Sequence, residues 1–168
     1  MIRIGMLSFA HMHAFCYAQC LQNIPFVEIT GIFDTNRKRG QSMSRKFKTS
    51  YFPDYRRLLK EDIDAVIICS ENSRHRLLSV AAAQAGKHIL CEKPIATTSY
   101  DAKVMLEVAR RRKVKFQTAF PCRFSPSIVR VKELVEDGTL GEVLAVKTTN
   151  QGVMPGGWFV QKKESGGG

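Results

Sequence analysis

Short apolar segments alternate with longer amphipathic ones along this chain, and that alternation constrains the fold more than any other feature. The apolar segments have the length of strands and are nearly continuous, which is typical of strands covered on both faces. The segments between them have helical periodicity. The pattern predicts an α/β fold with a doubly wound parallel sheet. The expected strands are Ile2–Leu7, Val27–Phe33, Ala65–Cys69, His88–Cys91 and Lys115–Ala119. The expected helices are His13–Gln22, Arg37–Phe47, Tyr55–Lys60, Arg74–Ala85 and Tyr100–Arg112, with Gly86 as a C-terminal stop and Ser99 as an N-cap.

The pattern changes after residue 120, which predicts that a second domain begins there. A helix is expected over Pro126–Asp137, a turn over Gly138–Gly141 and an alternating strand over Val143–Thr149, with no further element before the terminal glycines. That strand has no obvious partner and would present an open edge. We therefore interpret residues 1–120 as one domain and residues 121–168 as a connecting helix and the truncated beginning of an α+β second domain.

Composition narrows the class of protein. The net charge of +11 could indicate nucleic-acid binding. However, the basic clusters at 37–48, 56–60 and 110–115 fall on expected helices, so solvated helix faces are the favoured interpretation. The five scattered cysteines fit a reducing compartment, and no apolar run approaches the ~20 residues of a membrane span. The N-terminal segment is interpreted as a strand and not a signal peptide. We expect a cytoplasmic protein without nucleic-acid or membrane partners.

The first expected strand ends where a Rossmann-type sheet binds a dinucleotide, beyond the carboxyl ends of its strands. A G-x-G-x-x-G sequence is usual there. Here Ser8, Ala10 and His13 stand at the three glycine positions, with Phe9 and His11 between them. Serine and alanine are small enough for a pyrophosphate to approach the backbone. The third replacement predicts a wider loop or a displaced helix.

Asp34 ends the second expected strand, 34 − 13 = 21 residues beyond the last fingerprint position. An acidic group at this distance accepts hydrogen bonds from ribose hydroxyls and repels a 2′-phosphate, which favours NAD over NADP. The basic run 37–39 points the other way, because the guanidinium of Arg39 could hold that phosphate. A simpler alternative is that Asp34 caps the helix starting near Asn36.

Residue types that bind metal ions gather at the start of the first expected helix. His11, His13, Cys16 and Cys20 are residue types that bind zinc, but their spacing matches no standard finger. No metal is expected.

Motifs at three later strand ends resemble a known family. Residues 70–75 read Ser-Glu-Asn-Ser-Arg-His, residues 85–94 run from Ala-Gly-Lys-His to Cys-Glu-Lys-Pro, and residues 120–124 read Phe-Pro-Cys-Arg-Phe. In order and spacing the chain resembles the Gfo/Idh/MocA family, which includes glucose–fructose oxidoreductase and inositol dehydrogenase. The resemblance covers essentially the whole chain, including residues 138–143. It implies an NAD(P)-dependent dehydrogenase or reductase of a sugar, polyol or related hydroxy or carbonyl substrate.

The resemblance also assigns roles to individual residues. Glu92, Lys93 and Pro94 match the family's E-K-P motif beside the nicotinamide ribose and the substrate. Lys93 would be the catalytic residue, because an ammonium at the reacting oxygen stabilises developing negative charge and helps to manage its proton. Without the family, Lys93 would be interpreted as an ordinary exposed lysine.

A second set of residues matches the family's cofactor-binding segments. Asn72 and His75 match a T-P-N-x-x-H segment near the ribose and phosphates, although Ser70 and Glu71 replace its Thr-Pro. Arg123 matches the arginine of an R-F-x-P segment near the nicotinamide or substrate. The expected cofactor-binding residues are Ser8, Phe9, Ala10, His11, His13, Asp34, Arg39, Ser70, Asn72, His75, Glu92, Lys93, Pro94 and Arg123.

The family's catalytic histidine lies beyond the glycine segment at 166–168, so this chain would hold the cofactor-binding portion only. The resemblance implies that the full-length protein is a homo-oligomer whose second domain supplies the substrate pocket. Two alternatives stay open. One is a non-catalytic dinucleotide-binding or sensing protein, and the other is a basic nucleic-acid-binding module.

Overall fold

A computed structural model of the chain describes residues 1–149, 151–153 and 155–167. These residues form two compact units. The first comprises Met1–Ala119 together with the residues from Gly157 onward, and the second comprises Phe120–Gly156. Each unit is described by itself.

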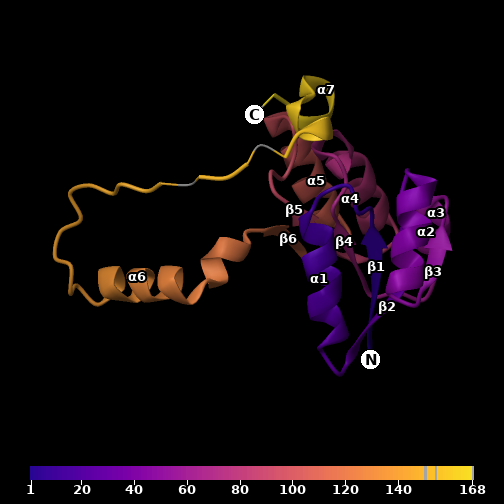
Figure 1. The fold of residues 1–168 in the computed structure, drawn as a ribbon, viewed down its shortest axis with the longest axis horizontal. Coiled ribbons are helices and arrows are strands. Elements are labelled where there is room, and N and C mark those ends of the chain that lie inside the picture. The colour runs from indigo at the N-terminus through magenta and orange to yellow at the C-terminus, as the bar shows by residue number, and fades with distance from the viewer. Residues whose placement is uncertain (150, 154, 168) are drawn as a thin grey trace. The chain divides into compact units, whose positions relative to one another are not determined.

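The first unit is built on a six-stranded, wholly parallel sheet with the strand order β3-β2-β1-β4-β5-β6 (Figure 1). The direction of winding reverses between β1 and β4, which is the topological switch point of a Rossmann-type sheet. The predicted doubly wound α/β fold is therefore confirmed. The strands are β1 (Ile2–Leu7), β2 (Val27–Phe33), β3 (Ser50–Phe52), β4 (Ala65–Ile68), β5 (His88–Glu92) and β6 (Phe116–Ala119).

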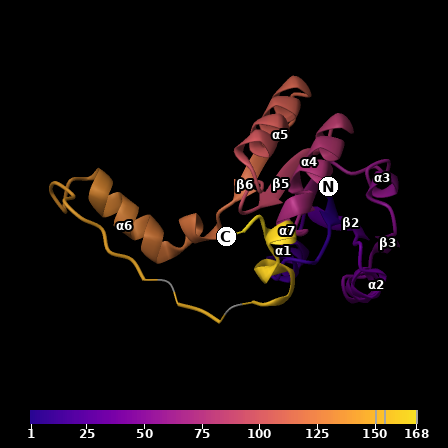
Figure 2. The same ribbon diagram turned by 90° about the horizontal axis from the view of Figure 1, so that it is seen from above.

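Helices cover both faces of this sheet, with α4 and α5 on one side and α1 on the other (Figure 2). Leu58, Leu78 and Met105 on α3, α4 and α5 belong to one buried cluster, whereas Ala18 of α1 and Phe47 after α2 belong to a second. Burial of both faces explains the nearly continuous apolar character of the strands. The helices are α1 (His13–Gln22), α2 (Arg37–Lys46), α3 (Tyr55–Leu58), α4 (His75–Gln84) and α5 (Ser99–Arg111), and a 3-10 turn, η1 (Asn72–Arg74), precedes α4.

Several local predictions needed correction. The N-cap of α5 is Thr98 and not Ser99, because the Thr98 hydroxyl accepts a hydrogen bond of 3.1 Å from the backbone N–H of Asp101. Strand β3 was not predicted, since three residues are too few to show a periodicity. Gly86 does end α4 with a positive φ of 74°, as predicted.

The second unit contains the turn η2 (Pro121–Phe124) and the helix α6 (Pro126–Glu136), which was predicted. The predicted strand Val143–Thr149 is wrong, because residues 143–149 form no strand and pair with no strand in the part of the chain that the structure describes. A lone strand leaves its backbone groups unpaired. That residues 121–168 begin a substrate-binding domain stays a prediction.

The residues from Gly157 onward form two short helical segments that were not predicted, η3 (Gly157–Val160) and α7 (Lys162–Ser165). They pack against the sheet-bearing part of the same unit, where the indole N–H of Trp158 donates a 3.1 Å hydrogen bond to the carbonyl of Ala10. No helix in the described part of the chain is long and apolar enough to cross a bilayer.

Candidate functional site

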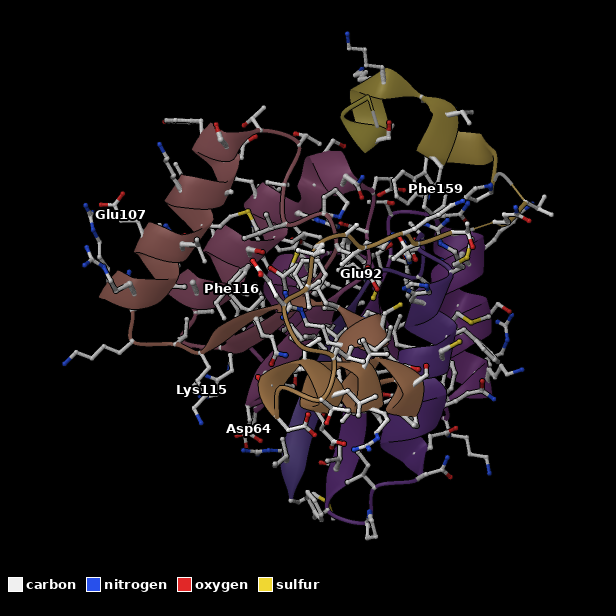
Figure 3. The ribbon with its side chains drawn as sticks, turned by 90° about the vertical axis from the view of Figure 1, so that its left-hand side faces the viewer. Asp64, Glu92, Glu107, Lys115, Phe116 and Phe159 are labelled. Carbon is white, nitrogen blue, oxygen red and sulfur yellow. The ribbon has the colours of Figure 1, made fainter. Side chains whose placement is uncertain are left out.

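The carboxyl ends of four neighbouring strands bring buried polar side chains to one edge of the sheet. Figure 3 shows Glu92 and Phe159 toward this end of the first unit and Asp64, which precedes β4, toward the other. Because these groups are cut off from water, each needs a protein partner or a ligand. The buried polar residues that follow or end β1, β2, β4 and β5 are Ser8, Asp34, Ser70 and Glu92.

The loop after β1 has a backbone conformation that usually requires glycine, although it contains none at the fingerprint positions. Ser8 has a φ of 79°, in the left-handed region that normally favours glycine. Its hydroxyl accepts a 3.1 Å hydrogen bond from the N–H of Ala10 and donates a 3.2 Å bond to Asp34. The serine thus adopts the backbone conformation that its position requires and holds it with its own side chain.

Asp34 joins this loop to helix α2. Its carboxylate accepts a 2.8 Å hydrogen bond from the N–H of Phe9, and Arg39 binds it through Nε and a terminal nitrogen, both at 2.8 Å. Charge-assisted hydrogen bonds arranged as a fork of this kind are among the strong hydrogen bonds in proteins. The N-cap of α2 is Asn36, whose side chain accepts from the Arg39 N–H, and Asp34 accepts a 2.8 Å hydrogen bond from the Asn36 N–H just before the helix.

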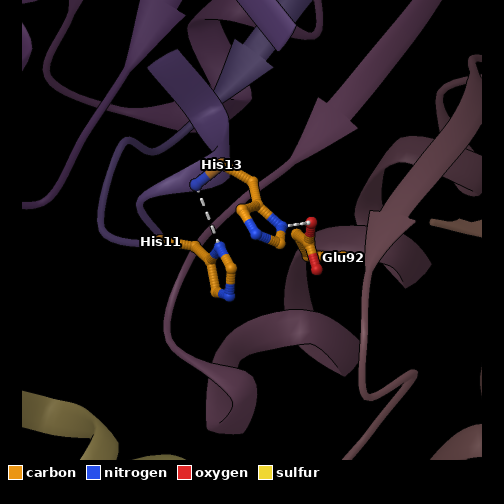
Figure 4. A group of neighbouring side chains, drawn as sticks. All are labelled: His11, His13 and Glu92. Carbon is orange, nitrogen blue, oxygen red and sulfur yellow. Dashed lines mark hydrogen bonds and ion pairs between the residues drawn. The ribbon is translucent and has the colours of Figure 1, made fainter. Parts of the chain in front are cut away.

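Glu92, fully buried at the end of β5, is the centre of a hydrogen-bonded cluster (Figure 4). Its Oε1 lies 2.7 Å from Nδ1 of His13 and 2.5 Å from the hydroxyl of Tyr17, while Oε2 accepts a 2.7 Å bond from the N–H of Lys93. Burial raises the pKa of Glu92, but the hydrogen bonds from Tyr17 and His13 outweigh it and leave that pKa below its ordinary value. Glu92 is therefore an anion held by three donors.

The same surroundings shift the pKa values of two side chains that neighbour Glu92, His11 and Tyr17. Burial lowers the pKa of His11 to about 4, so its imidazole is neutral near pH 7. Burial and the hydrogen bond to Glu92 raise the pKa of Tyr17 far above its ordinary value, so the phenol keeps its proton and stays a donor.

His13 begins α1, and its side chain turns toward Glu92 (Figure 4). The close packing expected of the third glycine position is supplied instead by Ala14 and Ala18, both fully buried on the inner face of α1. Tyr17, which sequence reasoning missed, lies one helical turn after His13 and shares its partner. The four-residue spacing was the available signal.

A cavity of about 220 Å³ lies between this cluster and the C-terminal segment. Lys93 is exposed at the cavity, whereas His11 and Asn72 are buried in its wall. The Asn72 side chain donates a 2.9 Å hydrogen bond to the carbonyl of Ser165 and so ties α7 to η1. The cavity is lined by His11, Asn72, Lys93, Pro94, Phe159 and Ser165.

His75 is buried and bridges the segments that follow β4 and β5. Its Nδ1 lies 2.9 Å from the carbonyl oxygen of Pro94, and its Nε2 lies 3.3 Å from that of Ser70. Burial lowers the pKa of His75. The ring thus fixes the segment that carries Lys93 and Pro94. The predicted contact of His75 with a cofactor stays a prediction.

Most predicted site residues gather at this edge of the first unit. Arg123 belongs to the second unit, on η2, with its guanidinium 5.5 Å from the centre of the Phe120 ring, and its role stays a prediction. The cysteines considered as zinc ligands are exposed on α1. The residues gathered at the edge are Ser8, Phe9, Ala10, His11, His13, Asp34, Arg39, Ser70, Asn72, His75, Glu92, Lys93 and Pro94.

Comparisons with known proteins agree with this architecture. Residues 2–120 match the model of a family described as an oxidoreductase family with an NAD-binding Rossmann fold, GFO_IDH_MocA. An uncharacterized oxidoreductase of Bacillus subtilis is 34% identical over 141 residues, which is 83% of this chain and 41% of that protein. Myo-inositol 2-dehydrogenase of Thermotoga maritima is 29% identical over 156 residues, which is 92% of this chain and 46% of that protein.

A solved structure shows the same fold with a cofactor bound. The WlbA dehydrogenase of Bordetella pertussis, in complex with NADH and UDP-GlcNAcA, superposes with a TM-score of 0.78 at 25% identity, covering 83% of this chain and 43% of that one. The present chain thus spans less than half the length of these relatives.

Proposed function

The chain belongs to the Gfo/Idh/MocA family of NAD-binding oxidoreductases, and we propose that its protein is an NAD-dependent dehydrogenase or reductase of a sugar, polyol or related hydroxy or carbonyl compound. The observation that carries the proposal is the loop after β1. Ser8 adopts the positive φ of the first fingerprint glycine, and Asp34 receives the N–H of Phe9 at the same edge. A pyrophosphate can therefore approach the backbone although all three glycines are replaced.

The pairing of Asp34 with Arg39 supports NAD over NADP. Both forked contacts of the guanidinium are made to Asp34, and a terminal nitrogen also lies 3.9 Å from Glu71. A 2′-phosphate would have to break these contacts and would lie beside a buried carboxylate. The ribose hydroxyls of NAD carry no charge, and they could bind the fully buried carboxylate by displacing one of the donors that it already accepts from.

Lys93 is the residue that we propose for catalysis. The cofactor would supply the hydride chemistry, in which a hydride moves between nicotinamide C4 and the substrate carbon. The ammonium of Lys93, exposed at the cavity, would lie at the substrate oxygen, stabilise its negative charge and handle its proton. The Lys93 N–H to Glu92 and the His75 contact to Pro94 hold the backbone of this segment on both sides of Lys93.

An activity measurement tests this role. The full-length protein is assayed for reduction of NAD⁺ with a panel of polyols and sugars, together with Lys93→Met and the control Lys103→Met, an exposed lysine of α5. We expect Lys93→Met to lower kcat by about 10²-fold or more, with NADH affinity nearly unchanged, and the control to match the wild type. Equal activity of both variants would refute the role of Lys93. Binding of NADH without turnover of any substrate would favour a sensing protein instead.

For the full-length protein we further propose a homo-oligomer in the cytoplasm with a small-molecule substrate. The relatives named for their activity act on small molecules, as the myo-inositol enzyme of Thermotoga maritima does by its name.

A further inference from the structure

We propose that His11, His13 and Glu92 form a binding site for one divalent transition-metal ion such as Zn²⁺, beside the cavity that Lys93 lines. One nitrogen of each imidazole and one carboxylate oxygen lie within 4.8 Å of one another (Figure 4). The three residues come from the loop after β1, the first turn of α1 and the end of β5, so the tertiary fold itself assembles them. The proposal goes beyond the dehydrogenase function and does not depend on it.

The ligand types fit such an ion. Two histidines and one glutamate are a ligand set that zinc takes in sites with a fourth position open to water or substrate. Imidazole nitrogen favours zinc and its neighbours in the first transition row over magnesium or calcium, which prefer sites made only of oxygen. The open position would face the cavity, because His11 is part of the cavity wall.

The required movement is small. Zinc bonds of about 2.0–2.1 Å at tetrahedral angles place the ligand atoms about 3.4 Å apart. His13 Nδ1 and Glu92 Oε1, now 2.7 Å apart, would separate slightly, and His11 would approach them. The ion would take the place of the hydrogen between His13 Nδ1 and Glu92 Oε1, and a neutral His13 would then carry its proton on Nε2.

Outer contacts already orient these ligands, as they do in most metal sites. The hydroxyl of Tyr17 and the N–H of Lys93 hold the two oxygens of Glu92. The N–H of His13 donates to Nδ1 of His11 at 3.2 Å, and the rings of Phe159 and His11 pack in a T-shaped arrangement with centroids 5.3 Å apart. The Lys93 charge opposes a cation here, whereas the Glu92 charge, buried and adjacent, favours it.

Metal titration of the 168-residue chain, purified without a histidine tag, tests the proposal. Zn²⁺ is titrated calorimetrically and Co²⁺ by its visible absorption, with the stoichiometry checked by elemental analysis. We expect one ion per chain and a cobalt spectrum without thiolate charge-transfer bands. His13→Gln and Glu92→Gln should each weaken binding by at least about 10²-fold, because even the loss of an outer contact costs about 10–100-fold.

Matched controls separate this site from adventitious ones. His88→Gln changes an exposed histidine at the start of β5, and a Cys16→Ser, Cys20→Ser double variant removes the exposed thiols of α1. Both should bind as the wild type does. Thiolate bands in the wild-type cobalt spectrum, loss of binding in the cysteine variant or no saturable binding would each overturn the proposal. If a ligand variant fails to fold, the cobalt spectrum of the wild type still tests whether nitrogen and oxygen ligands, without thiolate, hold the ion.

The same preparations are titrated with NADH, which keeps the two proposals apart. Metal binding without NADH binding would leave the metal site standing and refute the cofactor role. NADH binding without metal binding would identify the three residues as a hydrogen-bonded cluster only.

Discussion

The hydroxyl of Ser8 lies 3.2 Å from Oδ2 of Asp34, and both side chains are buried. This contact joins the loop proposed to hold the phosphates of the cofactor to the carboxylate proposed to hold its ribose. It also shows how a serine can stand where a glycine is usual, since its side chain stabilises the backbone conformation that its Cβ disfavours.

The first prediction concerns the two opposing contributions of Ser8, its stabilising hydrogen bonds and its unfavourable backbone conformation. Ser8→Ala keeps the unfavourable φ of 79° and removes both hydrogen bonds, whereas Ser8→Gly removes the bonds but also relieves the strain. We expect Ser8→Ala to lower the free energy of unfolding by about 1–3 kcal/mol. Ser8→Gly should be about 1 kcal/mol more stable than Ser8→Ala. Urea unfolding measures both. An alanine variant as stable as the glycine variant would show that the backbone at Ser8 is not strained.

The second prediction concerns the Arg39 pair. Arg39→Ala leaves Asp34 buried without its guanidinium partner, and we expect the free energy of unfolding to fall by about 2–4 kcal/mol. Arg37→Ala, an exposed neighbour in α2, is the control and should change it by less than about 0.5 kcal/mol. Similar unfolding curves for both variants would mean that the pair contributes nothing to stability.

A third prediction is a pattern of thiol reactivity. Burial raises the pKa of Cys69 well above its ordinary value and that of Cys91 to about 12, so neither forms a thiolate near neutral pH. The exposed residues Cys16, Cys20 and Cys122 should be alkylated by iodoacetamide in the native protein, and the two buried ones only after denaturation. Mass spectrometry of the digested protein identifies which cysteines carry the alkyl group before and after denaturation. Rapid native labelling at Cys69 would contradict the position of β4 in the core.

The fourth prediction concerns pH. Burial lowers the pKa of His75 in the folded state below about 6.5, the value expected in the unfolded chain. The unfolded chain therefore binds the proton first, and the stabilising contribution is present above about pH 6.5 and is lost as the pH falls. His75→Gln should flatten the dependence of unfolding free energy on pH below about pH 6.5. His88→Gln, at an exposed position, should not. Parallel slopes for the two variants would show that His75 is not held neutral.

Much of the fold could be predicted because local patterns of apolar and polar residues indicate its strands and helices. The strands Ile2–Leu7 and Val27–Phe33 have the predicted bounds, since buried parallel strands leave continuous apolar runs. The wrong predictions concern features with weak local signals. The alternation at Val143–Thr149 resembled a strand, but a strand forms only where a neighbour completes its hydrogen bonds.

The internal contacts of the site could not be predicted, because they join residues far apart in the sequence. Tyr17 and Glu92 are 75 positions apart, and Trp158 and Ala10 are 148 apart. Only the folded sheet decides which side chains meet at its edge. The sequence therefore indicated which residues would lie there, whereas the pairing of His13 with Glu92 needed the structure.

The central claim is that this edge of the sheet binds NAD, and calorimetric titration of the chain with NADH and NADPH tests it most directly. Asp34→Ala and the exposed control Glu28→Ala are titrated in parallel, with Asp34→Asn as a second variant and circular dichroism to confirm folding. The account predicts saturable binding with NADH preferred, and loss of that preference in the Asp34 variants only. A folded wild-type chain that binds neither nucleotide, or that prefers NADPH, would contradict it.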